Sequence, residues 1–261
     1  MIALISDFGT QDAYVGIMKG VIKEIAYDCP IVDINNNIPR HDIHAAAYNL
    51  AASVSYFPEK TIFLCVVDPG VGTSRKALIM NAGNKLFVAP DNGLLSYVIS
   101  ELSPDKIISI ENKKYMLEKV SNTFHGRDVF APAAAHLFNN TSISSFGPEL
   151  RKEELDFLPE YKKIEKTEST INGHVIYIDI FGNLITNIKE SCLNGNGYKV
   201  VIHNRILEGL KKSYGDVAKG KPLAYMGSGG YLEIAVNNGS AAELYEAVIG
   251  TEVKITKNLV V

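Results

Sequence analysis

The first 158 residues alternate short apolar segments with segments of helical periodicity, and this alternation constrains the fold most strongly. Three apolar segments have the length and composition of buried strands: 2–5, 31–34 and 61–67. Helical periodicity follows the first two, over residues 12–26 and 42–54, and Asp12 and Asp42 stand where N-caps are expected. Strands separated by helices indicate βαβ units. Residues 1–158 are therefore predicted to form an α/β domain with a largely parallel sheet.

The character of the sequence changes near residue 158. Residues 159–170 are polar and charged, which is typical of a linker. Helical patterns nearly vanish beyond them, and short strand-like segments alternate with Gly/Asn turns: 174–180, 184–187, 199–203, 231–236 and 252–256. A smaller β-barrel domain is therefore predicted over residues 171–261.

Composition excludes several classes of protein. The formal net charge is −3 and no basic stripe is visible, which disfavours a nucleic-acid partner. No apolar run approaches the roughly 20 residues of a membrane span, and Asp7 interrupts any signal-peptide core. The three cysteines lie far apart without a CxxC pair, and the histidines show no metal-ligand spacing. We expect a cytoplasmic protein with no membrane partner and no bound metal.

Polar residues recur where the predicted parallel strands end. Asp7 follows the first strand, Asp68 follows the segment 61–67, and Asp91-Asn92 follow KLFVAP. A single aspartate there is more often a turn or cap residue, but several at one edge indicate a ligand crevice, because open parallel sheets bind ligands outside the carboxyl ends of their strands. His125 stands beside a glycine before a helix predicted over residues 128–138, where a ligand could approach the backbone closely.

Taken together and in order, seven segments resemble the S-adenosyl-L-methionine hydroxide adenosyltransferases, which are related to fluorinating and chlorinating adenosyltransferases. They are SDFGTQD, DINNNIPRHDI, VVDPGVGTSR, APDNGLL, TFHGRDVFAP, IDIFGNLITNI and GSGGYLEIAVNNGSA. The resemblance runs nearly end to end and implies an N-terminal α/β domain joined to a C-terminal β-barrel. It also implies hydrolysis of S-adenosyl-L-methionine to adenosine and L-methionine, with a preference for the (R)-sulfonium epimer and without a cofactor.

The resemblance places the water-positioning trio of the family on Asp68, Arg75 and His125. The halide-using relatives carry Tyr at the position of Asp68 and a Tyr-Ser pair at His125-Gly126, so this chain resembles the hydrolase branch. A carboxylate and an imidazole can orient a water molecule and accept its proton. The sequence leaves open which of Asp68 and His125 takes that proton.

Substrate contacts are implied on both sides of the linker. Asp7 matches the carboxylate that accepts both ribose hydroxyls, and His41 is a possible lining residue. In the second half, Asp179 matches the partner of the methionine amine and Ser228 a contact of the methionine carboxylate, although Gly229 replaces an arginine of the halide enzymes. The remaining matches concern the adenosine: Phe181 packs against it, Asn183 recognises adenine, and main-chain groups of Tyr231, Glu233 and Val236 read the adenine edge.

Two alternatives remain, namely halide transfer to a 5′-haloadenosine and a non-catalytic adenosine or S-adenosyl-L-methionine sensor. The resemblance further implies a homotrimer whose pockets pair the N-terminal domain of one protomer with the C-terminal domain of its neighbour.

Overall fold

The apolar segments of the N-terminal half become neighbouring strands of one sheet. In the computed structural model, which describes residues 1–159, 164–193 and 197–257, β1 (Ile2–Ser6) pairs in parallel with β2 (Ile31–Asn35) and β3 (Ile62–Val66). β5 (Lys85–Pro90) extends the sheet in parallel beside β3, and β4 (Ala77–Ala82) and β6 (Pro104–Ser109) add antiparallel strands. The order β2-β1-β3-β5-β4-β6 confirms the predicted α/β class with a largely parallel sheet.

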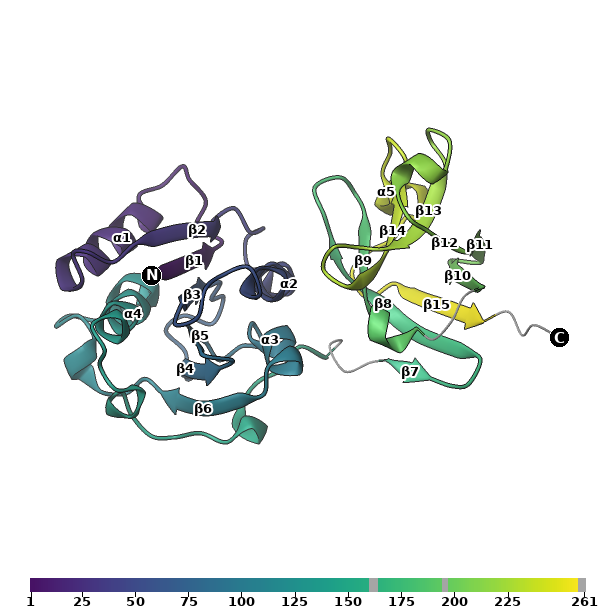
Figure 1. The fold of residues 1–261 in the computed structure, drawn as a ribbon. Coiled ribbons are helices and arrows are strands. Elements are labelled where there is room, and N and C mark those ends of the chain that lie inside the picture. The colour runs from purple at the N-terminus through teal and green to yellow at the C-terminus, as the bar shows by residue number, and fades with distance from the viewer. Residues whose placement is uncertain (160–163, 194–196, 258–261) are drawn as a thin grey trace. The chain divides into compact units, whose positions relative to one another are not determined.

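Helices cover both faces of this sheet (Figure 1). α1 (Tyr14–Ile25) packs with α4 (Ala131–Phe138) on one side, and α2 (Ile43–Val54) packs with α3 (Ser96–Glu101) on the other. Every residue of β1 and β3 is buried as a result. This double coverage explains why these strands are continuously apolar and show no alternation.

The helix boundaries correct two expectations. Asp42 caps α2 as predicted, because its Oδ1 accepts the backbone N–H of Ala45 at 2.9 Å. Asp12 does not cap α1, which begins at Tyr14 without a side-chain cap. The helix expected from residue 128 begins earlier as the π-helical turn η2 (Gly126–Phe130) and continues as α4. Short 3-10 turns also occur in this part of the chain: η1 (Lys113–Tyr115), η3 (Ile143–Ser145) and η4 (Lys152–Glu154).

The C-terminal part forms one curved, almost wholly antiparallel sheet. Its strands are β7 (Glu165–Lys166), β8 (Thr170–Ile178), β9 (Leu184–Lys189), β10 (Tyr198–Ile202), β11 (Arg205–Glu208), β12 (Leu210–Lys211), β13 (Pro222–Met226), β14 (Tyr231–Val236) and β15 (Glu252–Lys257). Short helices η6 (Glu190–Cys192), η7 (Tyr214–Asp216) and α5 (Ala241–Tyr245) connect them. The main path is β11-β10-β15-β8-β9-β14-β13-β12, and contacts between β11 and β13 nearly close it into the predicted barrel.

The chain divides into two units, Met1–Leu158 and Pro159–Val261. Of the predicted linker over 159–170, residues 160–163 lie outside the described residues. Its last part is not a free connection, since β7 pairs with β8 in the second sheet. Among the residues that the structure describes, no helix has the length and apolar character to cross a membrane.

Candidate functional site

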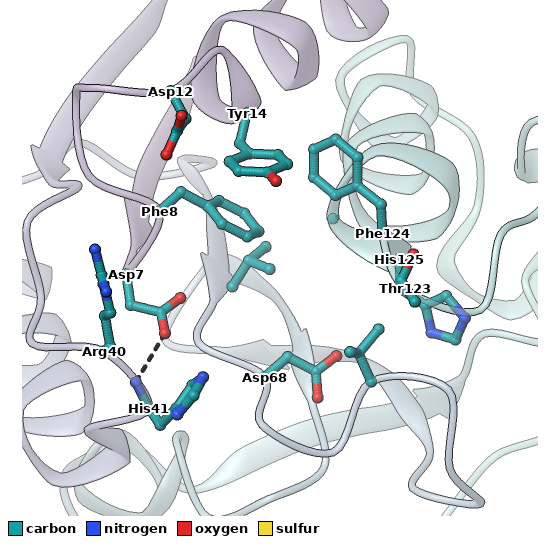
Figure 2. Close-up of a pocket in the computed structure, with 13 residues that line it drawn as sticks. Asp7, Phe8, Asp12, Tyr14, Arg40, His41, Asp68, Thr123, Phe124 and His125 are labelled. Atoms are coloured by element: carbon teal, nitrogen blue, oxygen red, sulfur yellow. Dashed lines mark hydrogen bonds between the residues drawn. The ribbon is translucent and has the colours of Figure 1, made fainter.

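A cavity of about 340 Å³ opens at the carboxyl ends of β1 and β3 (Figure 2). This is the edge at which open α/β sheets bind ligands. Its lining comes from four stretches of the chain: Asp7, Phe8, Asp12 and Tyr14; Arg40 and His41; Val66, Asp68 and Val71; and Thr123, Phe124, His125 and Gly126. The predicted residues Asp7, Asp68 and His125 therefore share one cavity.

Asp68, Arg75 and His125 form a connected cluster. The Nε of Arg75 lies 2.9 Å from Oδ1 of Asp68, and its Nη2 lies 2.5 Å from Oδ2, so the guanidinium holds both carboxylate oxygens. The two side chains are only 9% and 6% exposed. The same Nη2 lies 2.8 Å from Nδ1 of His125. A carboxylate is thus fixed beside an imidazole at the cavity wall.

The bond from Arg75 decides the protonation of His125. A guanidinium can only donate hydrogen bonds, so Nδ1 must accept and Nε2 must carry the proton of a neutral ring. Burial lowers the pKa of His125 and the charge of Arg75 lowers it further, against the opposing carboxylates of Asp68 and Asp128. His125 therefore presents a neutral N–H donor at neutral pH.

An ion pair with a buried carboxylate secures the loop that carries His125. Asp128 is fully buried, and its carboxylate accepts from Nε of Arg127 at 2.5 Å and from the backbone N–H of Ser121 at 2.8 Å. The hydroxyl of Ser121 in turn accepts the backbone N–H of Phe124 at 3.1 Å. Burial alone would raise the pKa of Asp128, but these hydrogen bonds outweigh it and lower the pKa. The loop and the first turn of η2 are therefore tied together.

Asp7 is oriented from the opposite wall of the cavity. Its Oδ2 accepts the backbone N–H of His41 at 2.9 Å, and His41 has a left-handed backbone with φ of 64°. This bond uses one carboxylate oxygen and directs the group at the end of β1. His41 lines the cavity, as the sequence suggested.

An aromatic cluster beside Asp7 was not predicted. The rings of Phe8, Tyr14 and Phe124 lie with their centroids 5.2–5.6 Å apart. Phe8 and Tyr14 both belong to the segment that begins at SDFGTQD, which was the available signal. These rings give the polar cavity an apolar wall against which a ribose or base can pack.

Asp91 and Asn92 stand behind the cavity and do not line it, which corrects the expectation that they face the same crevice. Asn92 donates from Nδ2 to the carbonyl of Val67 at 2.9 Å and accepts the N–H of Leu94 at 3.2 Å. Asp91 accepts the N–H of Asp156 at 3.0 Å, and burial raises its pKa. Asn92 thus holds the backbone next to Asp68 in place, whereas Asp91 holds the backbone at Asp156.

A second cavity of about 660 Å³ lies within the C-terminal unit. It is lined by Phe181, Asn183, Tyr214, Val236, Asn237, Asn238, Gly239 and Ser240. Phe181, Asn183 and Val236 were predicted from the sequence, whereas Tyr214 was missed because nothing in its polar surroundings relates it to residue 183. An exposed phenyl ring, an amide and a phenol around one hollow suit a planar polar ring.

The turn between β8 and β9 depends on Asp179. Its Oδ1 accepts the N–H groups of Phe181 and Asn183 at 2.9 and 2.8 Å, and its Oδ2 accepts from Nδ2 of Asn183 at 2.8 Å. Gly182 has φ of 78°, and a Cβ there would lie 2.2 Å from the hydroxyl of Ser240. Asp179 thus shapes the turn that presents Phe181 and Asn183.

The other predicted contacts of this unit are spread along β13 and β14. Ser228 and Gly229 are exposed at the turn between these strands. Tyr231 and Glu233 lie on β14 between β9 and β13, where their main-chain groups take part in sheet pairing. Val236 lies two residues beyond Ile234, the last residue of β14 that pairs with β9, and it lines the second cavity. The structure therefore brings Val236, rather than Tyr231 or Glu233, to that cavity.

Across residues 1–159, 164–193 and 197–257, no three His, Cys, Asp or Glu side chains are grouped to hold a metal ion. The sequence prediction of no metal remains an expectation for the working enzyme.

A carboxylate held by a guanidinium beside a neutral imidazole, at the ligand-binding edge of an α/β sheet, can orient a water molecule and accept its proton, as a hydrolytic enzyme requires. The model of the SAM hydroxide adenosyltransferase N-terminal domain matches residues 2–147, and that of the C-terminal domain matches residues 173–254. The chain belongs to the SAM hydroxide adenosyltransferase family.

Full-length relatives agree with this assignment. An (R)-S-adenosyl-L-methionine hydrolase of Thermus thermophilus is 38% identical, over 96% of this chain and 97% of the relative. A fluorinase of Actinoplanes sp. is 28% identical, over 98% and 97%. The crystal structure of an uncharacterized conserved protein from Thermotoga maritima is 36% identical and superposes with a TM-score of 0.89, covering 98% of this chain and all of the other.

Proposed function

We propose that this protein hydrolyses S-adenosyl-L-methionine to adenosine and L-methionine, with a preference for the (R)-sulfonium epimer. The cluster of Asp68, Arg75 and His125 carries the proposal, because it suits the activation of water. The 38% identical relative from Thermus thermophilus bears the name (R)-S-adenosyl-L-methionine hydrolase, which supports the epimer preference.

The chemistry requires help mainly for the nucleophile. The oxygen of water bonds to C5′ while the C5′–S bond breaks. The electron pair of the C5′–S bond stays on sulfur, so methionine leaves as a neutral thioether. No acid is needed at the leaving group, and no metal or organic cofactor is needed for electron balance. Since His125 carries its proton on Nε2, we assign Asp68 as the group that accepts the proton of water, and His125 as a donor that orients the water oxygen. Arg75 supplies fixed positive charge.

The deciding experiment incubates separately prepared (R) and (S) epimers with the enzyme in the presence of EDTA and chromatographs the products. We expect adenosine and methionine, formed faster from the (R) epimer and without added metal. A 5′-chloroadenosine product at high chloride would establish the halide alternative. A bound nucleoside with no turnover would establish a sensor.

The Asp7→Ala variant should bind adenosine more weakly by about 1.5–3 kcal/mol, the worth of hydrogen bonds to a charged group. The reason is the proposed role of the carboxylate as acceptor of both ribose hydroxyls. Calorimetric titration with adenosine and 2′-deoxyadenosine measures it, with Asp105→Asn on the exposed part of β6 as control. If the variant separates the two nucleosides as well as the wild type does, the ribose assignment is wrong.

The pH dependence of kcat/KM should have an acid limb centred below pH 6.5, the ordinary value for histidine. Protonation of Nδ1 would end its bond from Arg75 and place two cations together, so activity is lost as pH falls through the lowered pKa of His125. A pH–rate profile tests this, and His125→Gln should lose the limb together with most activity. A limb centred above 6.5, or a limb that keeps its position in the variant, would contradict it.

We further propose a cytoplasmic homotrimer in which each substrate is held by the N-terminal unit of one subunit and the C-terminal unit of the next. The implied substrate contacts are divided between the units, since Asp7 and Asp68 belong to the first and Asn183 to the second. Ile180 and Phe181 are 92% and 73% exposed at their turn, which favours contact with a further surface. The free thiols Cys29, Cys65 and Cys192 support a reducing compartment.

A further inference from the structure

A chain of hydrogen bonds runs behind Asn183 in the C-terminal unit. Nδ2 of Asn183 lies 3.0 Å from the hydroxyl of Tyr214, which lies 2.8 Å from the hydroxyl of Tyr225. The hydroxyl of Tyr225 lies 2.5 Å from Oε2 of Glu233. The four residues come from the β8–β9 turn, η7, β13 and β14, so the chain links elements far apart in the sequence.

Glu233 sets the direction of every bond in this chain. Its carboxylate accepts the single proton of Tyr225, so the oxygen of Tyr225 must accept from Tyr214. Tyr214 has then used its own proton and accepts from Asn183. Burial and the hydrogen bond to Glu233 raise the pKa of Tyr225, which keeps that phenol protonated as a donor.

The side-chain amide of Asn183 is thereby fixed in one orientation. One N–H goes to Tyr214 and the other to Oδ2 of Asp179, so the two amide protons are both used. Asn183 is 4% exposed and lines the second cavity together with Tyr214. The carbonyl oxygen is the polar group that Asn183 can still offer to a ligand. If the amide flipped, its carbonyl oxygen would face the oxygens of Asp179 and Tyr214, which are themselves acceptors.

The side chain of Glu233 is closely packed at the end of the hydrogen-bond chain. A Cβ at Gly227 would lie 1.8 Å from Oε1 of Glu233, so the carboxylate packs directly against the backbone of the turn between β13 and β14. Glu233 was expected to read adenine with its main chain. Its side chain instead terminates the hydrogen-bond chain.

We propose that Tyr214, Tyr225 and Glu233 are positioning residues that hold Asn183 as a hydrogen-bond acceptor and so select 6-aminopurines over 6-oxopurines. The inference rests on the proposed function, in which the C-terminal unit receives the adenine. The exocyclic amine of adenine donates to the fixed oxygen of Asn183, whereas the 6-oxo group of hypoxanthine would meet it with a second acceptor. Loss of the chain leaves Asp179 as the single anchor of the amide, so the amide is held less firmly and the discrimination is weakened.

The test compares binding of adenosine and inosine by calorimetry in the wild type and in Tyr225→Phe, Tyr214→Phe and Glu233→Gln. We expect the preference for adenosine to fall about five- to tenfold in each variant, as one net hydrogen bond would give. KM for S-adenosyl-L-methionine should rise with kcat nearly unchanged. Tyr198→Phe on β10, a strand that pairs with β11 and β15, is the matched control.

The selectivity of a double variant, compared with that of each single variant, distinguishes the positioning role from a merely structural one. The double variant Tyr225→Phe/Glu233→Gln should lose no more selectivity than either single variant, because one broken link already removes the contribution of the chain to holding the amide. Tyr214 is 39% exposed, so Tyr214→Phe keeps the test informative if substitution at the half-buried Tyr225 or Glu233 prevents folding. Folded variants with unchanged selectivity would overturn the positioning role alone. A wild type that binds neither nucleoside would overturn the proposed function and this inference with it.

Discussion

Replacing Asp68 with asparagine should lower kcat by about 10²–10⁴-fold, the range that general-base catalysis contributes. The amide keeps the shape of the carboxylate but cannot take a proton from water or balance the charge of Arg75. Adenosine binding should stay within a few-fold of the wild type, because the assigned partner of Asp68 is water. Single-turnover rates and adenosine titrations measure the two effects separately.

Arg75 provides the control for this expectation. Arg75→Met should also reduce turnover, but it leaves a carboxylate that is 6% exposed without its partner. Removing one member of a buried pair costs about 3–5 kcal/mol of unfolding free energy, so this variant should unfold at lower urea than the wild type. Proportional loss of turnover and adenosine affinity in folded Asp68→Asn would assign Asp68 to substrate binding.

Mixing two inactive variants should restore activity if the pocket is shared between subunits. Asp68→Ala damages the N-terminal unit and Asp179→Ala the turn that presents Asn183. After co-refolding at equal amounts, about a quarter of the pockets in a cyclic, head-to-tail trimer would combine the two intact halves. The specific activity of the mixture, compared with each variant refolded alone, measures the recovery.

A pocket confined to one chain would always contain one lesion, and mixing would then recover nothing. Subunit exchange must be demonstrated in parallel, by mass spectrometry of trimers that carry a tagged and an untagged variant. Exchange without recovery would refute the shared pocket and leave the hydrolase proposal intact.

Local sequence chemistry predicted those parts of the site that lie at strand ends. Asp7 and Asp68 follow uninterrupted apolar strands, and a parallel sheet must bring such ends to one edge. The cap at Asp42 was predictable for the same kind of local reason. Asp12 shows the limit of this reasoning, because the helix begins at Tyr14 and the aspartate lines the cavity instead.

Long-range hydrogen bonding was beyond the reach of the sequence. Tyr214 contacts Asn183 across 31 positions of sequence, and neither residue type nor spacing marks the pair. β13 escaped prediction because it begins at a proline, which is depleted in strands. Directions of hydrogen bonds, such as that from Arg75 to His125, follow only from coordinates.

The hydrogen bond from Asn92 to the carbonyl of Val67 supports the main chain beside the site without involving the side chain that is assigned to the chemistry. It fixes the main chain immediately before Asp68 and makes no use of the side chain at position 68. A substitution of Asp68 can therefore change which nucleophile the cavity favours while the main chain before residue 68 keeps its hydrogen bond. Such a division lets one scaffold diversify by exchanging a few side chains.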